Sequence, residues 1–311
     1  MMNKKLNRKS DYMVYDVIII GLGPAGISAA IYAKRSGLKT LVIESKMPGG
    51  LLNYTNVVNN YPGFINISGP DLSFKMYEHF KSYDIEYKNE EVIDLVDGEI
   101  KKIMTSSGEY ETKNVIIATG RSRRSLNLPH EEELRGGGIS YCAMCDGHFY
   151  KDKSVGVVGA GDSSLEEALY LANVVRDVTI IVRGNRLSGN DELVKKVENS
   201  QNIRVLFGKN VKELLIQDGK LKGVLLDDGE QVELSGLFVY IGFDPVLPFR
   251  SDVGIEKENG YIKVNEDGET NIPGIYAAGD IVKKSLYQII SAESEGAIAA
   301  TSIIRKLTKK N

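Results

Sequence analysis

The run Tyr15-Asp-Val-Ile-Ile-Ile20, followed by Gly21-Leu-Gly23-Pro24-Ala25-Gly26, decides the fold of this chain. Its first half is apolar and β-branched, which is typical of a strand buried in a parallel sheet. A helical segment from Ile27 to Ser36 and a second strand from Lys39 to Ile43 follow, and Glu44 ends that strand. The order strand, glycine loop, helix and strand predicts an α/β unit of the Rossmann type.

Each small residue of this loop has a physical role. Gly21 permits the tight turn, Gly23 lets the backbone approach a pyrophosphate, and Gly26 allows close helix packing, so that the helix N-terminus faces the phosphates. A carboxylate at Glu44 can accept hydrogen bonds from ribose hydroxyls. A glycine-rich turn without a ligand is the alternative, but the complete unit predicts a dinucleotide site that includes Pro24 and Ala25.

The same pattern recurs in the middle of the chain. A strand at Ser154–Val158 leads into Gly159-Ala-Gly161-Asp162-Ser163-Ser164, and a helix (165–174) and a strand (178–182) follow. Ser164 takes the place of the third glycine and is small enough for close packing. The chain therefore carries two dinucleotide-binding units.

Further strands end where a parallel sheet receives its ligand. Val115–Ala118 leads into Thr119-Gly120, and the run from Asn271 leads into Gly279-Asp280, before a helix over about 286–307. The simplest architecture has two Rossmann-like three-layer domains of the α/β class, the second inserted into the first. We expect residues 1–121 and 250–311 in the first domain and 125–246 in the second, with a β-meander over 211–242.

Composition excludes several classes of protein. The 311 residues carry a net charge of −3 without a basic face, which argues against a dedicated nucleic-acid binder. No apolar run reaches the roughly 18 residues of a membrane helix. The basic residues 1–12 lack a signal-peptide core, so we interpret them as a disordered tail or as an extension upstream of a start at Met13.

The two cysteines of the chain are Cys142 and Cys145, separated by Ala-Met and followed by Asp146. Such a close pair indicates redox chemistry or half of a zinc site. With three histidines and no second cysteine pair, we expect no metal. A carboxyl group at Asp146 could move the proton that thiol exchange requires. A stabilising disulfide or two free thiols is the alternative interpretation.

Over essentially its whole length the chain resembles the low-molecular-weight, bacterial-type thioredoxin reductases, which are class II pyridine nucleotide-disulfide oxidoreductases. The matching runs include the first glycine loop, Gly49-Gly50-Leu51-Leu, Asn60-Tyr-Pro-Gly-Phe64, Ala118-Thr-Gly120, Gly138-Ile-Ser-Tyr-Cys-Ala-Met-Cys-Asp-Gly147, Gly161-Asp-Ser-Ser-Leu-Glu-Glu167, Tyr240-Ile-Gly-Phe243 and Ala278-Gly-Asp280.

The resemblance implies a flavin-dependent enzyme that forms cytoplasmic homodimers. The first domain would bind FAD and the inserted domain a reduced nicotinamide nucleotide. Hydride would pass to the flavin, and two electrons would pass on to the disulfide. Cys145 would face the flavin, Cys142 would attack thioredoxin or a thioredoxin-like protein, and Asp146 would act as acid and base. The FAD contacts implied are the loop Gly21–Gly26, Glu44, Gly49, Gly50, Leu51, Asn60, Thr119, Gly120, Gly279, Asp280 and Gln288.

The resemblance also implies two hinges, near Arg121–Arg124 and Phe243–Pro248, because nicotinamide and disulfide compete for one side of the flavin. The nucleotide contacts of the inserted domain would be Gly159, Gly161, Asp162, Ser163, Ser164 and Arg183.

Two departures from the family pattern concern the cofactors. The usual His-Arg-Arg run that holds the 2′-phosphate of NADPH is Val182-Arg183-Gly184 here, with Arg186 nearby and Ser188 at the later arginine position. NADPH is the expected donor, and NADH or a reduced ferredoxin are the alternatives. Near the expected flavin, Leu51 replaces a glutamine and Tyr287 replaces an arginine, changes that would remove polar groups.

Other functions remain as alternatives. A ferredoxin–NADP-type flavin reductase shares this fold but lacks the cysteine pair, and a peroxide-system reductase would need a further N-terminal domain. A flavoprotein redox sensor would keep the flavin site but would have no use for Asp146 beside two cysteines.

Overall fold

The computed structural model describes residues 13–55 and 57–308, so the interpretation of residues 1–12 as a tail lies outside the described part. The chain folds into two compact units. The first comprises the described parts of Met1–Asn53, Val57–Arg121 and Pro245–Asn311, and the second those of Tyr54–Asn56 and Ser122–Asp244. Both units are α/β, as the repeated strand, loop and helix pattern predicts.

The first unit is built on a sheet with the strand order β5-β2-β1-β8-β7-β6, and β21 also pairs with β8. The strands β5, β2, β1, β8 and β21 run parallel, whereas β6, β7 and the first half of β8 form an antiparallel meander. The bounds are β1 (Val14–Ile20), β2 (Thr40–Glu44), β5 (Glu86–Asn89), β6 (Val92–Val96), β7 (Lys101–Thr105), β8 (Glu109–Ile117) and β21 (Ile275–Ala277).

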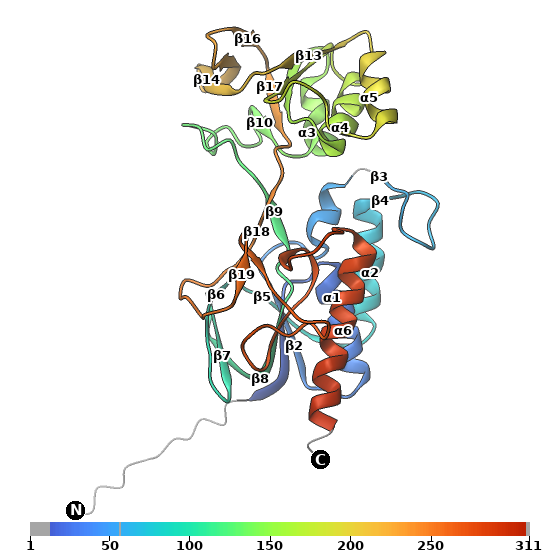
Figure 1. Ribbon diagram of the computed structural model, residues 1–311, viewed down its shortest axis with the longest axis vertical. Helices are drawn as coiled ribbons and strands as arrows, with labels where there is room; N and C mark the ends of the chain where they lie inside the picture. The colour runs from blue at the N-terminus through green and yellow to red at the C-terminus, as the bar shows by residue number, and fades with distance from the viewer. Residues whose placement is uncertain (1–12, 56, 309–311) are drawn as a thin grey trace, which may run out of the picture. The chain divides into compact units, whose positions relative to one another are not determined.

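Strand β1 is buried on both faces, which explains its continuous apolar sequence. Val17 and Ile19 pack toward helices on one face, and Ile18 and Ile20 belong to the core on the other face. Figure 1 shows the three long helices of this unit side by side against its sheet. They are α1 (Pro24–Arg35), α2 (Gly69–Lys81) and α6 (Ile289–Thr308).

The shorter elements of the first unit lie in its loops. They are the 3-10 helices η1 (Gly50–Tyr54) and η3 (Gly279–Ile281), and the two-residue strands β3 (Val57–Val58), β4 (Ile67–Ser68), β19 (Lys257–Glu258) and β20 (Tyr261–Ile262). None of the helices in the described ranges is long and apolar enough to cross a membrane.

The second unit repeats the plan with a parallel sheet in the order β10-β17-β11-β12-β13. Its bounds are β10 (Ile139–Ser140), β11 (Ser154–Val158), β12 (Asp177–Val182), β13 (Ile203–Phe207) and β17 (Gly236–Val239). The helical segments are α3 (Ala143–Asp146), η2 (Gly147–Tyr150), α4 (Asp162–Ala172) and α5 (Asp191–Glu198). The chain leaves and re-enters the first unit through two paired strands, β9 (Arg121–Arg123) and β18 (Phe243–Pro245).

The meander expected over 211–242 is wrong in its last part. Within this range, the strands β14 (Val211–Gln217), β15 (Lys220–Leu226) and β16 (Gln231–Glu233) do form an antiparallel sheet. The run Gly236–Val239 leaves them and pairs in parallel with β10 and β11, and all four of its residues are buried. A Cβ at Gly236 would lie 2.5 Å from the Tyr150 ring, so glycine allows this strand to pack between β10 and β11.

Candidate functional site

The first glycine loop has the geometry that a dinucleotide requires. Gly21 has a φ of +105°, and a Cβ there would lie 2.4 Å from the carbonyl oxygen of Ala118. A Cβ at Gly26 would lie 1.9 Å from the carbonyl oxygen of Gly21. A Cβ at Gly23 would meet no described atom within 4 Å, and no described side chain caps α1 at Gly23. Gly21 and Gly26 thus pack tightly against the backbone, whereas the space beside Gly23 at the helix N-terminus is open, which fits a pyrophosphate.

Glu44 lies at the carboxyl end of β2, the neighbour of β1. Its two carboxylate oxygens accept hydrogen bonds from the backbone N–H groups of Leu22 and Lys46, each at 2.9 Å. The carboxylate therefore braces the glycine loop from within. Each oxygen keeps a second lone pair that a ribose hydroxyl can use.

The Gly49-Gly50 turn lies against the same loop. The N–H of Gly49 donates to the carbonyl of Leu22 at 2.7 Å, and a Cβ at Gly50 would lie 3.6 Å from the Cα of Gly23. Both glycines have positive φ, +107° and +58°, and Leu51 follows them half-buried in η1. The structure thus places the loop Gly21–Gly26 and the Gly49-Gly50 turn beside each other at one sheet edge.

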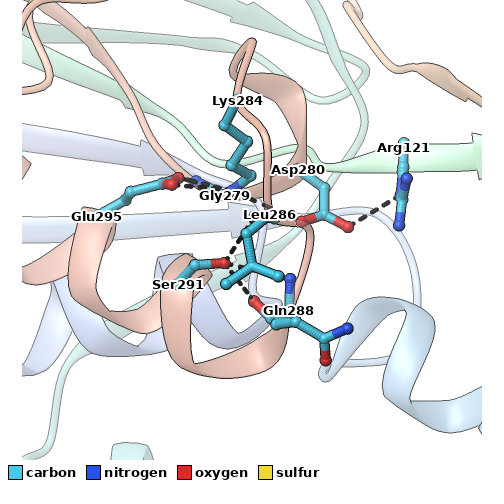
Figure 2. A network of polar contacts seen from close by, with 8 residues as sticks. All are labelled: Arg121, Gly279, Asp280, Lys284, Leu286, Gln288, Ser291 and Glu295. Carbon is cyan, nitrogen blue, oxygen red and sulfur yellow. Dashed lines mark hydrogen bonds and ion pairs between the residues drawn. The ribbon is translucent and has the colours of Figure 1, made fainter.

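Figure 2 shows a polar network around η3 and the start of α6. The Nε of Arg121 lies 2.9 Å from Oδ2 of Asp280, and the Nζ of Lys284 lies 2.8 Å from Oε2 of Glu295. The same Glu295 oxygen accepts from the N–H of Gly279 at 2.8 Å. The loop that carries Asp280 is therefore held by two largely buried ion pairs.

Two more of the expected FAD contacts meet beside this network. The side-chain amide of Asn60 donates to Oε1 of Gln288 at 2.9 Å. On the neighbouring strand end, the Thr119 hydroxyl donates to the carbonyl of Val246 at 2.5 Å, and Gly120 has a φ of +65°. All of the expected FAD contacts thus belong to the first unit.

The sequence did not single out Arg121 as a site residue. Its guanidinium carbon lies 4.5 Å from the centroid of the Tyr287 ring, while its Nε pairs with Asp280. Tyr287, in the loop before α6, stands where the family has an arginine, and Arg121 of β9 brings a cation to this tyrosine. The only signal in the sequence was the arginine-rich run after Gly120, which we interpreted as a hinge.

The second glycine loop closes in the same manner. Gly159 has a φ of +145°, and a Cβ there would lie 2.4 Å from the carbonyl oxygen of Tyr240. A Cβ at Gly161 would meet no described atom within 4 Å, and no described side chain caps α4 there. The hydroxyl of Ser164 donates to the carbonyl of Gly161 at 2.6 Å, and the neighbouring Ser163 is exposed. This loop also fits a pyrophosphate.

The segment after β12 folds against this second loop. The N–H of Ser188 donates to the carbonyl of Ala160 at 2.8 Å, and that of Asn190 donates to Oδ1 of Asp162 at 2.7 Å. Arg183 and Arg186 are exposed on this segment and form no ion pair with any residue that the structure describes. These two guanidinium groups are the cations of this segment that could hold a 2′-phosphate.

The two cysteines form the disulfide that the family resemblance implies, with their Cα atoms 5.3 Å apart. Cys142 is the N-cap of α3, and its Sγ accepts from the N–H of Cys145 at 3.2 Å. A helix N-terminus favours a thiolate, so this position suits an attacking sulfur at Cys142. Yet Cys142 is only 6% exposed, whereas Cys145 is exposed. Attack by Cys142 therefore requires a rearrangement that uncovers its sulfur.

Asp146 ends α3 and is linked to the first cysteine by Ser140. The Ser140 hydroxyl donates to Oδ2 of Asp146 at 2.7 Å and accepts from the N–H of Cys142 at 3.0 Å. Ser140, which the sequence did not single out, thus holds the carboxylate on the turn Cys142–Asp146, which we call the redox turn. A carboxylate in this position can relay a proton to the cysteine pair.

Comparison with known proteins agrees with this geometry. The family model for pyridine nucleotide-disulphide oxidoreductases matches residues 15–296. A thioredoxin reductase of Bacillus subtilis is 44% identical over 94% of this chain and 95% of its own. The crystal structure of the Lactococcus lactis thioredoxin reductase matches with a TM-score of 0.89 and 40% identity, covering 95% of this chain and 99% of that one.

A further solved structure is a ferredoxin-flavin thioredoxin reductase from Clostridium acetobutylicum. It is 33% identical, covers 95% of this chain and 98% of its own, and has a TM-score of 0.53. Thioredoxin reductases of this family use FAD and NADPH. The chain belongs to the pyridine nucleotide-disulphide oxidoreductases and, within them, to the thioredoxin reductases.

Proposed function

We propose that this chain reduces the disulfide of a thioredoxin or thioredoxin-like protein through Cys142 and Cys145, as a cytoplasmic homodimer. The observation that carries the proposal is the disulfide on the first turn of α3, with Asp146 held beside it, in the unit that also contains the second glycine loop. FAD, when bound to the first unit, supplies the two-electron carrier between the nicotinamide nucleotide and this disulfide.

The residues of the first unit bind and orient the flavin nucleotide. The open helix N-terminus at Gly23 receives the pyrophosphate, and Glu44 accepts from ribose hydroxyls while it braces the loop. Asp280 and Gln288 present oxygens next to the Gly279 turn. The matching residues of the second loop receive the pyrophosphate of the nicotinamide nucleotide, and Arg183 its 2′-phosphate.

Thiol exchange then follows from the chemistry of the reduced pair. The Cys142 thiolate attacks one sulfur of the thioredoxin disulfide and forms a mixed disulfide, while the other thioredoxin sulfur leaves as a thiolate. Cys145 attacks Cys142 Sγ, which releases the second thioredoxin thiolate and restores the Cys142–Cys145 bond. Asp146 takes the proton from Cys145 and delivers it to a departing sulfur.

The electron donor is the open part of this function. NADPH is the first candidate because exposed Arg183 and Arg186 can reach a phosphate. A reduced ferredoxin is the second, because the segment 182–190 carries only these two cations and the chain resembles the ferredoxin-flavin enzyme of Clostridium acetobutylicum.

One anaerobic experiment tests both levels of the proposal. The rate of flavin bleaching is measured with NADPH, NADH and reduced ferredoxin side by side, and thioredoxin reduction is followed with the best donor. Cys142→Ser and Cys145→Ser each abolish thioredoxin reduction but keep flavin bleaching. Full thioredoxin turnover by either variant overturns the proposed role of the pair, and fast bleaching by ferredoxin alone overturns NADPH as donor.

A further inference from the structure

A buried charged cluster lies beneath the redox turn, and the mechanism above does not use it. The N–H of Ala143, between the two cysteines, donates to the Tyr240 hydroxyl at 2.9 Å. The guanidinium of Arg123 lies 4.8 Å from the centroid of the Tyr240 ring and also donates to the carbonyl of Tyr141. These contacts join the residues on either side of Cys142 to one tyrosine and one arginine.

Glu167 of α4 completes this cluster. It is 8% exposed, and its Oε2 has no hydrogen-bond partner among the described residues. The Nε of Arg123 is likewise buried without a hydrogen-bond partner in that part of the chain. The nearby Glu167 carboxylate contributes, after burial itself, to the raised pKa of Tyr240. Glu167 and the tyrosine that holds the redox turn therefore act on each other electrostatically.

Burial raises the pKa of Glu167 to about 7, and the Arg123 cation opposes that rise. The other charged or titratable groups around Glu167 are Glu166 on the same helix and Tyr240, and α3, which ends in Asp146, packs against α4. A carboxyl in this range changes its charge in response to a modest change of field.

We propose that Glu167 is a positioning residue for the redox turn and that it takes up a proton when the Cys142–Cys145 disulfide is reduced. The inference rests on the redox role proposed above for these cysteines. Reduction by two electrons and one proton breaks the sulfur–sulfur bond and leaves one thiol and one thiolate. The new negative charge disfavours a second one in the same cluster, so Glu167 binds one further proton from solvent.

This coupling predicts how the cysteine pair equilibrates with dithiothreitol. The ratio of reduced to oxidised pair is measured by alkylation and mass spectrometry between about pH 5.5 and 8.5, on the protein with its flavin. Glu167→Gln raises that ratio near pH 8 by about tenfold, the factor that one pKa unit represents, and leaves it unchanged near pH 5.5. Glu167→Asp retains the wild-type pH dependence.

Glu198→Gln, an exposed carboxylate on α5, is the matched control and has no effect. Should Glu167→Gln fail to fold, Arg123→Gln tests the same charge from the opposite side. Loss of the cation raises the proton affinity of Glu167, so the ratio of reduced to oxidised pair should change its pH dependence at a higher pH than in wild type. Curves that run parallel to wild type at every pH overturn the coupling. The role of the cysteines fails separately, if Cys145→Ser still reduces thioredoxin.

Discussion

Replacing Glu167 by glutamine should stabilise the protein, and the gain should grow with pH. The carboxyl has an ordinary pKa of 4.5 and a pKa of about 7 in the folded protein, because burial disfavours its charged form. The fold therefore prefers the neutral carboxyl, which glutamine imitates. The cost of the charge is absent below the unfolded pKa, rises between the two values, and is complete above the folded value.

The magnitude follows from the two pKa values. At about 1.4 kcal/mol per unit, the difference amounts to roughly 3 kcal/mol near pH 8 and to roughly 1 kcal/mol near pH 5. Glu167→Gln should thus gain about 2 kcal/mol more at the higher pH, which is roughly 4 °C or more in the unfolding midpoint. Loss of attraction to Arg123 is already contained in the net shift.

Circular dichroism is the suitable assay, because the chain contains no tryptophan to report by fluorescence. Thermal unfolding is recorded for wild type, Glu167→Gln and the exposed control Glu198→Gln at both pH values. The unfolding midpoint of wild type is subtracted from that of each variant at each pH, which cancels the general effect of pH on the fold. The result of interest is how this difference changes between the two pH values. An equal difference at both pH values would refute the reasoning, because the carboxyl would then ionise in the fold as it does in water.

Three further predictions concern the sites. Arg121→Ala should weaken FAD binding about tenfold, because the ion pair that holds the Asp280 loop is lost. Arg124→Ala, which removes an exposed ion pair, should leave FAD binding unchanged. Equilibrium dialysis with FAD measures both affinities, and equal losses would contradict the assignment. Gly26→Ala should destabilise even the flavin-free protein, because its Cβ would lie 1.9 Å from the carbonyl oxygen of Gly21, whereas Gly23→Ala should lower FAD affinity alone. Melting curves of the two flavin-free variants that do not differ would speak against this. Asp146→Asn should slow thioredoxin reduction by about a hundredfold without slowing flavin bleaching, as stopped-flow absorbance can establish, and an unchanged rate would exclude proton transfer by this carboxyl.

Much of the fold is predictable because it depends on local chemistry. The apolar run of β1 contributes to a core on both faces of its sheet, as a continuous β-branched strand must. The glycines that open the two loops, Gly21 and Gly159, both have positive φ and meet a carbonyl oxygen where a Cβ would lie. The disulfide between Cys142 and Cys145 was implied by the family resemblance, whereas the spacing alone left a zinc half-site and two free thiols open.

The pairing of strands that are distant in the chain was harder to predict from the sequence. Gly236–Val239 has the composition of any short apolar strand, so its sequence favoured the meander that precedes it. In the structure it pairs with β11, and Gly236 packs so closely against the Tyr150 ring that no side chain fits there. No period or turn signal in the sequence records such a contact.

The sequence by itself determined the class of the protein, because glycine loops, strand ends and the cysteine pair carry their chemistry in adjacent residues. Only the tertiary structure decided which charges meet. It brought Arg121 onto Asp280 and Tyr287, and it placed Glu167 in one buried cluster with Arg123 and Tyr240. The physical reason is that burial and pairing set the energy of a charge, and both depend on residues that are distant in the chain.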